Sequence, residues 1–136
     1  MTKIGGWWLA TESLASDETV ISRYPTNYFH GSRRPYGGRL YLTDRRLIFL
    51  PHFIDSFFGA RRTSIDFSEI NRIEAETAES NQHGPHGSMP PRLEITTNEA
   101  IPHQFVVKNV QTVADDIRSA HQTSKDRLDL APQNKP

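Results

Sequence analysis

Cysteine is absent from this 136-residue chain, so disulfides, thiolate metal sites and cysteine nucleophiles are all excluded. Long apolar runs are absent too, since no stretch approaches the ~20 residues that a membrane-spanning helix needs. The first residues, MTKIGGWWLATES, lack the long apolar core of a signal peptide. These absences predict a soluble, cytoplasmic protein, and the length suits a single domain with one core.

Catalytic motifs are missing as well. The chain has no G-x-S-x-G elbow, no phosphate-binding P-loop, no dinucleotide fingerprint and no H-E-x-x-H motif. His83 and His86 stand close together in HGPHG, but no third ligand lies in that loop and its glycines and proline preorganise nothing. We therefore expect a non-enzymatic protein that has neither a metal site nor another cofactor.

Charge is balanced overall but unevenly distributed. The net charge is zero, yet residues 23–62 contain eight arginines against two aspartates. A basic segment attracts anionic partners, although intramolecular complementarity or a solvated face produces the same asymmetry. Because a nucleic-acid-binding domain is usually basic as a whole, the zero net charge argues against nucleic acid.

Alternating apolar and polar residues predict about seven short strands. In GRLYLTD, for example, Leu40 and Leu42 alternate with polar neighbours. Stretches rich in glycine and proline predict loops at 30–38, 53–62 and 77–91. The predicted strands are residues 19–29, 38–44, 45–52, two within 63–76, 92–97 and 101–108.

One segment has a helical period. In residues 109–125, Val110, Val113 and Ile117 recur at helical spacing, and Asn109 is placed to cap the helix. The polar residues after it predict a frayed tail. We divide the chain into an N-terminal extension (1–13), a domain (14–124) and a flexible tail (125–136).

These elements predict a mainly β fold with one C-terminal helix, in which a sheet of about seven antiparallel strands curls into a split barrel that the helix caps. A β-sandwich with a terminal helix is the alternative.

Several of these motifs together resemble a known family. The stretches GGRLYLTDRRLIFLP, FFG, SIDFSEINRIE, RLEITT and HQFVV, followed by the helix, resemble a GRAM domain of the pleckstrin-homology-like (PH-like) superfamily. The resemblance covers roughly residues 14–122; the long 77–91 loop and the Trp7-Trp8 pair depart from it. It implies the seven-stranded split barrel with its helical cap, and a module that binds phosphoinositides, other anionic lipids or protein segments.

Five arginines form the candidate ligand site. Arg33 and Arg34 lie in the first predicted loop, Arg39 begins the next strand, and Arg61 and Arg62 end the third loop. In a meander, the first and third loops emerge at the same end of the barrel, and a guanidinium binds phosphate with two parallel hydrogen bonds. The family resemblance implies a lipid-binding role for Arg33, Arg34 and Arg39. The alternative is that they serve solubility and edge protection.

Other conspicuous residues have structural explanations too. Arg45 and Arg46 belong to the second loop, at the other end of the barrel, and are expected to be hairpin residues. Phe57 and Phe58 stand beside Arg61 and Arg62 and are candidate membrane contacts. Burying such a ring in the core stabilises a protein by roughly 1.5–3 kcal/mol, which favours a core role for at least one of them.

Trp7 and Trp8 form an apolar pair near the start of the chain. They are candidates for an anchor, for packing against their own domain, or for a homodimer contact. Taken together, the sequence predicts a binding module, peripheral at a membrane, for an anionic phospholipid headgroup or membrane surface. The alternative is a protein-interaction module that holds a partner segment at a sheet edge or in a strand–helix groove.

Overall fold

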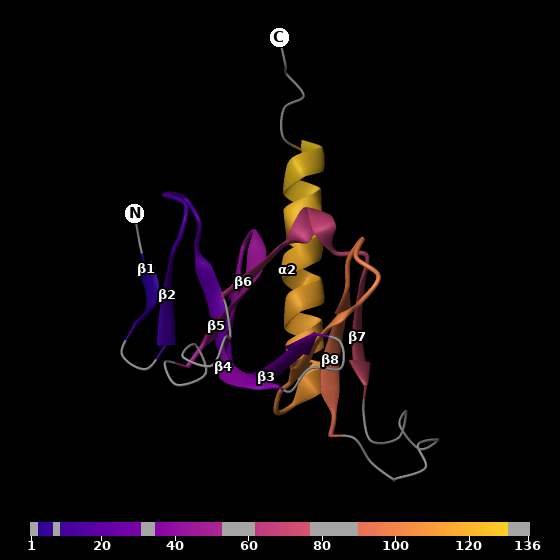
Figure 1. Ribbon diagram of the computed structural model, residues 1–136. Helices are drawn as coiled ribbons and strands as arrows, with labels where there is room; N and C mark the ends of the chain where they lie inside the picture. Colours follow the sequence, from indigo (N-terminus) through magenta and orange to yellow (C-terminus); the bar gives the residue numbers. More distant parts are fainter. Residues whose placement is uncertain (1–2, 7–8, 31–34, 53–61, 77–89, 131–136) are drawn as a thin grey trace.

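The computed structural model describes residues 3–6, 9–30, 35–52, 62–76 and 90–130 (Figure 1). Within these residues the chain forms nine strands, a short 3₁₀ helix and one long α-helix. Their bounds are β1 (Lys3–Gly6), β2 (Leu9–Ser13), β3 (Val20–His30), β4 (Tyr36–Thr43), β5 (Arg46–Pro51), β6 (Thr63–Asp66), η1 (Phe67–Glu69), β7 (Arg72–Glu76), β8 (Arg92–Thr96), β9 (His103–Val106) and α2 (Val110–Leu130).

Seven strands form one curved antiparallel sheet, in the order β6-β5-β4-β3-β9-β8-β7. The chain passes from the edge strand β6 to the opposite edge strand β7, and the two edges do not pair, so the sheet is not closed. Helix α2 packs along its inner side (Figure 1). The prediction of a mainly β, PH-like fold with about seven antiparallel strands and one C-terminal helix is confirmed.

A second, two-stranded sheet of β1 and β2 lies within the stretch that the sequence suggested was an N-terminal extension. Leu14 and the partly buried Ile4 pack with Tyr41, Ile48 and Leu50 on the outer side of β4 and β5. This explains the nearly continuous apolar character of β4 and β5, because strands covered on both faces have no solvent-facing side that requires polar residues.

The main core lies between the inner side of the sheet and α2. Val113 and Ile117 of the helix are buried against strand residues such as Leu42, Phe49 and Phe105. The Arg118 guanidinium donates to the carbonyl of Ile73 in β7 at 2.8 Å. These contacts confirm the predicted helical stripe.

Two details of the helix differ from the prediction. It continues to Leu130, so the first residues of the predicted tail are helical. Within DRLDL, the arginine and both leucines are good helix formers. Asn109 accepts a hydrogen bond from the N–H of Val113 through its carbonyl, as expected before the first turn, but its φ of 54° is left-handed rather than extended.

A side-chain hydrogen bond joins β3 to the helix: the Tyr24 hydroxyl donates to Asp116 Oδ2 at 2.9 Å. Burial, with the nearby Asp116 carboxylate, raises the pKa of Tyr24 to about 12. Because this folded-state pKa lies above the ordinary value of 10.0, the protonated phenol contributes stability at lower pH that is lost as the pH rises between these two values.

We therefore expect Tyr24→Phe to lower the free energy of unfolding by about 1 kcal/mol near neutral pH. The variant should also lose less stability than the parent between about pH 9 and about pH 11. Urea unfolding at these two pH values measures both effects. An alkaline loss of the same size in the variant would show that Tyr24 does not titrate with the fold.

Candidate functional site

A groove of about 1180 Å³ lies between β3, the start of β4 and the junction of β9 with α2. It exists because β3 pairs with β9 only through Asn27–His30, so the two strands separate before Asn27. Opposite this opening, Gly37 and Gly38 face Asn27 and Thr26 across the β3–β4 pair, and both line the groove. The groove is lined by Tyr24, Pro25, Thr26, Asn27, Gly37, Gly38, His52, Pro91, Val106, Val107, Lys108, Asn109, Val110 and Gln111.

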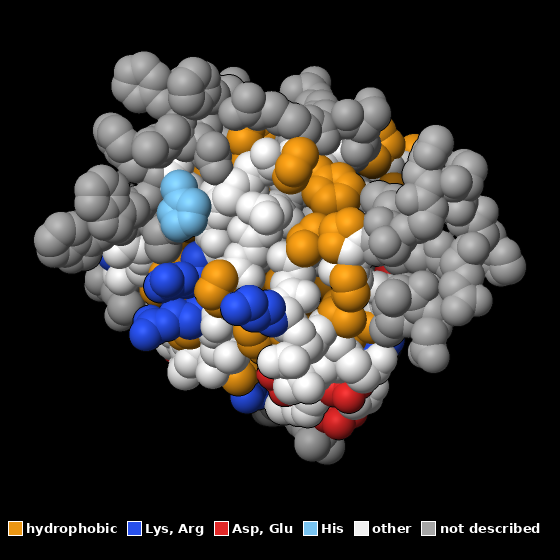
Figure 2. Space-filling model, turned by 90° about the horizontal axis from the view of Figure 1, so that it is seen from below, with side chains coloured by type: hydrophobic (Ala, Val, Ile, Leu, Met, Phe, Trp, Pro, Cys, Tyr) orange, Lys and Arg blue, Asp and Glu red, His pale blue; other side chains and the backbone are white. Residues whose placement is uncertain are grey.

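Cationic side chains lie in and beside this groove, which we call the β3 groove. Its lining includes Lys108 and His52 but no carboxylate. Arg39 stands directly opposite Pro25 in the β3–β4 register, and Arg23 precedes Pro25 by two residues, on the same face of β3. Seen from below, this face shows Lys and Arg side chains beside a strip of apolar ones (Figure 2).

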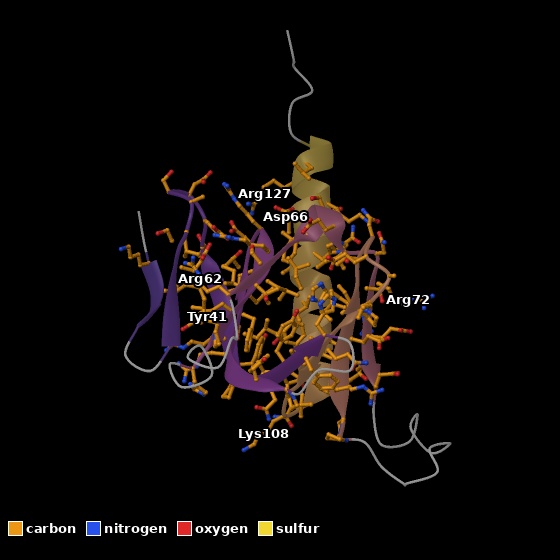
Figure 3. The ribbon with its side chains drawn as sticks, viewed as in Figure 1. Tyr41, Arg62, Asp66, Arg72, Lys108 and Arg127 are labelled. Carbon is orange, nitrogen blue, oxygen red and sulfur yellow. The ribbon has the colours of Figure 1, made fainter. Side chains whose placement is uncertain are left out.

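The three cations of this face are not neutralised locally. Arg23, Arg39 and Lys108 form no ion pair with any residue that the structure describes. Lys108 projects from the lower end of the molecule (Figure 3). Unpaired cations beside apolar surface suit a ligand that has an anionic head and a hydrocarbon part.

The predicted arginines are placed as follows. Arg39 lies beside the β3 groove, whereas Arg62 forms an ion pair with Glu12 of β2 at 3.2 Å, on the side of the small sheet (Figure 3). Arg33, Arg34 and Arg61 lie outside the described residues, as do the candidate contacts Phe57, Phe58, Trp7 and Trp8.

The strand directions agree with the expected meander. The β3–β4 and β5–β6 connections, which contain Arg33, Arg34 and Arg61, join strands at the same end of the sheet. Next to these connections in the chain, Gly37 and His52 both line the β3 groove, and the N–H of His52 donates to the carbonyl of Gly37 at 2.9 Å.

Arg23 and Lys108 were not predicted. Counting the hairpin register back from the glycine pair would have placed Arg23 on the same face as Arg39. Lys108 joins them because β9 lies beside β3, a pairing between distant parts of the chain that local periodicity does not reveal.

Arg45 and Arg46, at the connection between β4 and β5, have structural roles, as expected. Arg46 donates from Nε to Glu18 at 2.8 Å and from Nη1 to Glu12 at 3.2 Å, and it also bonds the carbonyl of Ser13. Arg45 pairs with Asp17. Burial alone would raise the pKa of Glu18, but hydrogen bonds from Arg46, Thr43 and the Ala15 N–H outweigh it and lower that pKa.

At the far end of β3, three side chains that could ligate a metal converge. The ligand atoms of His30, Glu99 and His103 all lie within 4.8 Å of one another. The sequence singled out a different histidine pair, His83 and His86, which lies outside the described residues. His30 and His103 face each other only through the β3–β9 register, so no local spacing marks them.

Comparison with known proteins places the fold. A model of the GRAM domain family matches residues 10–112. The C-terminal domain of an unknown protein from Leishmania infantum has a TM-score of 0.57 at 17% identity, over 77% of this chain and 85% of that one. The hSac2 domain of the human phosphoinositide phosphatase Sac2 has a TM-score of 0.54 at 16% identity, over 85% of this chain and 74% of that one. At these identities the two structures share a fold with this chain.

No curated protein sequence matches the chain. In the part of the chain that the structure describes, no helix combines the length and the hydrophobicity needed to cross a bilayer.

Proposed function

Because this chain belongs to the GRAM domain family, we propose that it is a non-enzymatic module that binds the anionic headgroups of phospholipids at a membrane surface. The family and the PH-like fold support a lipid- or protein-binding module. The observation that carries the lipid proposal is the β3 groove, whose largely apolar lining includes Lys108 and no carboxylate, with Arg23 and Arg39 beside its residue Pro25 on β3 and β4.

The magnitudes suit reversible association. A Lys or Arg near an anionic membrane contributes about 1 kcal/mol, and the effect falls off within a Debye length. Three such cations give only a weak attraction, so further contacts are needed. We assign them to Arg33, Arg34 and Arg61, which lie in the connections next to Gly37 and His52, and to insertion of Phe57 or Phe58. Arg62 would contribute only by leaving Glu12.

Co-sedimentation with liposomes tests this proposal. The protein should bind phosphatidylcholine vesicles that contain an anionic lipid, and bind them less at physiological than at low salt. A triple variant, Arg23→Ala/Arg39→Ala/Lys108→Ala, should weaken binding about a hundredfold, since each charge contributes about 1 kcal/mol. The Arg33→Ala/Arg34→Ala variant tests the first connection in the same way.

A matched control removes the same number of charges elsewhere. Arg72, Lys125 and Arg127 are exposed, and the two that are labelled, Arg72 and Arg127, project away from Lys108 (Figure 3). Replacing these three residues by alanine should leave most of the binding intact. If both triple variants lost the same amount of liposome binding, net charge and not the β3 groove would explain the effect. The proposal would be overturned if the parent protein bound vesicles equally well with and without anionic lipid.

A partner segment is the second candidate ligand, and a different groove favours it. Between β3 and α2 lies a groove of about 640 Å³, lined on one side by Thr19, Ile21 and Ser22 and on the other by helix residues such as Ala120 and Thr123. The first half of β3 pairs only with β4 among the described strands, so its other edge faces this groove. A peptide that added here as a strand would bind with little dependence on salt, unlike a membrane.

A further inference from the structure

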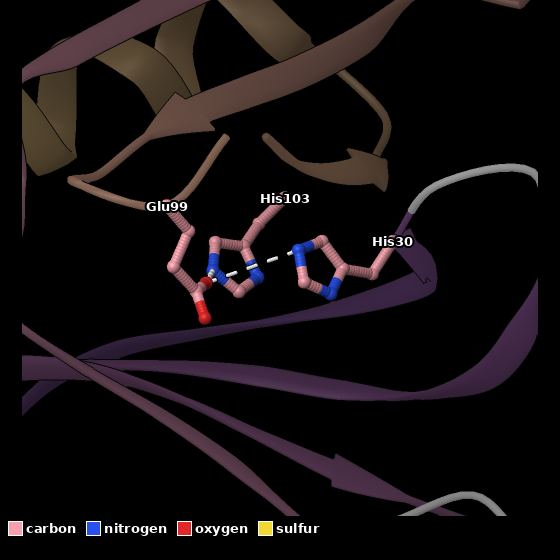
Figure 4. A group of neighbouring side chains, drawn as sticks. All are labelled: His30, Glu99 and His103. Atoms are coloured by element: carbon pink, nitrogen blue, oxygen red, sulfur yellow. Dashed lines mark hydrogen bonds and ion pairs between the residues drawn. The ribbon is translucent and has the colours of Figure 1, made fainter. Parts of the chain in front are cut away.

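Three side chains from separate parts of the chain meet at the end of the sheet where β3 pairs with β9. His30 ends β3, His103 begins β9, and Glu99 lies in the turn between β8 and β9 (Figure 4). Glu99 Oε1 is 3.2 Å from His103 Nε2 and 3.9 Å from His30 Nε2. Both imidazoles therefore direct the same nitrogen toward one carboxylate oxygen.

The two rings are held in place by their surroundings. They stack with centroids 4.4 Å apart and planes inclined by 9°. The buried Tyr28 hydroxyl lies 2.8 Å from His103 Nδ1, so the Nε2 atom of that ring is left to face Glu99. Tyr28 thus contacts the ring nitrogen of His103 that does not face Glu99. Metal-ligating histidines usually have such a hydrogen-bonding partner on their second ring nitrogen. His30 Nε2 lies 3.0 Å from the carbonyl oxygen of Ile101, to which it donates when protonated. This atom would have to lose its proton and leave the carbonyl to bind a metal.

The environment favours a cation. A cavity of about 250 Å³ adjoins the cluster and is lined by Glu69 and Glu99, with no lysine or arginine among its lining residues. Access is open, because the Glu99 side chain is 62% exposed and that of His30 is 34% exposed. An ion could therefore reach the site without any rearrangement of the buried His103.

The ligand set fits zinc, and one of the distances between its atoms does so already. Two imidazoles and one carboxylate, with a fourth position open to water, are a common set for Zn²⁺. With ligand bonds of about 2.0–2.1 Å in tetrahedral geometry, neighbouring donor atoms lie about 3.3 Å apart. The contact between His103 and Glu99 already has this length. His30 would have to turn out of the parallel stack and move its Nε2 atom inward, because two parallel stacked rings cannot both point their lone pairs at one ion. A half-exposed side chain can make this movement.

We propose that His30, Glu99 and His103 form a binding site for a divalent transition metal, with Zn²⁺ the best match. The ion would link the end of β3 to the β8–β9 turn. The end of β3 is also the point from which the connection that contains Arg33 and Arg34 continues. The site is independent of the proposed lipid site, since none of its three residues lines the β3 groove.

Zinc titration in competition with a chromophoric chelator tests this proposal on the full chain. The parent protein should bind one Zn²⁺, and the metal should raise its melting temperature. His30→Ala and Glu99→Gln should each weaken binding at least about a hundredfold, because each removes a direct ligand. Tyr28→Phe, which removes the hydrogen-bonding partner of His103 but no metal ligand, should weaken binding about 10- to 100-fold. Circular dichroism verifies that each variant is folded.

Two controls separate this site from other histidines. His52→Ala removes an exposed histidine outside the cluster, and His83→Ala/His86→Ala removes the pair in HGPHG; both variants should bind zinc as the parent does. Cobalt adds a spectroscopic readout, because d–d absorption bands should appear in the parent and be lost in His30→Ala. The proposal is overturned by unchanged affinity in His30→Ala and Glu99→Gln, by loss of binding in the His83/His86 variant, or by a parent that binds no zinc.

Discussion

Arg46→Met is expected to lower the free energy of unfolding by about 3–5 kcal/mol, the range for breaking one side of a buried ion pair. Arg46 is the only described cation that contacts Glu18, whose side chain is just 1% exposed. Methionine fills similar volume but donates no hydrogen bond, so the Glu18 carboxylate would lose its counter-charge while it stays buried. Arg46 also bridges β2, β5 and β6 through Glu12 and Ser64.

The dependence of the free energy of unfolding on pH below about 7 gives this prediction a second readout. In the parent, the lowered pKa of Glu18 means that its ionised form contributes stability above the ordinary pKa of 4.5, which is lost as the pH falls toward the folded-state value. In Arg46→Met, burial without the guanidinium should raise the pKa of Glu18. Protonation of Glu18 at low pH should then remove the cost of burying its unpaired charge. The stability difference between the two proteins should therefore narrow as the pH falls from about 7 to about 4.

Urea unfolding of both proteins at several pH values measures this difference. Arg45→Met is the matched control, because Arg45 is 43% exposed and pairs with the exposed Asp17. Such a surface pair contributes at most about 1 kcal/mol. The buried-pair explanation would be refuted if Arg46→Met lowered the free energy of unfolding by no more than Arg45→Met, or by an amount that does not change with pH.

Gly38→Ala is expected to destabilise the fold by about 3 kcal/mol, at the upper end of the range for overpacking a core. A Cβ atom at Gly38 would stand 2.3 Å from the carbonyl oxygen of Leu50 and 2.8 Å from both the Pro51 Cα and a ring carbon of Phe49. Two of these three atoms belong to the backbone of β5, so relief requires the β4–β5 pair to separate rather than a side chain to rotate.

The neighbouring residue supplies the control for this variant. Gly37 is partly exposed at the rim of the β3 groove, so Gly37→Ala should change the free energy of unfolding by less than about 1 kcal/mol. Both variants are compared by urea unfolding at one pH. Equal effects would mean that the cost arises from backbone freedom of the glycine pair and not from the approach of β5.

Those glycines belong to the part of the fold that the sequence predicted best. Alternation locates strands because one face of each strand meets the core, as for Leu40 and Leu42. The same logic did not reveal β1 and β2, whose covering role is shown only by the apolar outer residues Tyr41, Ile48 and Leu50. A strand that is apolar on both faces predicts a second covering layer but does not say which segment provides it.

The candidate sites were harder to predict than the fold. Arg39 was predicted because it begins the strand after the first loop and matches the family's basic residues, and it lies beside the β3 groove. Lys108 reaches the same face only through the β3–β9 pairing. The cluster of His30, Glu99 and His103 depends on that pairing as well. Local periodicity determines which side of a strand a residue occupies, whereas long-range pairing determines its neighbours across the sheet.

The β3–β9 pairing also has a consequence for biosynthesis, because it joins an early and a late part of the chain. Strand β3 gains its second neighbour only when residues 103–106 pair with residues 27–30, and α2, which covers the inner core, follows still later. Contacts this distant in sequence slow folding. On the ribosome, β3–β6 can form early as a half-sheet whose apolar side, including Leu42 and Phe49, stays open to chaperones until the helix has been translated. Both proposed sites are therefore completed only near the end of translation of this domain.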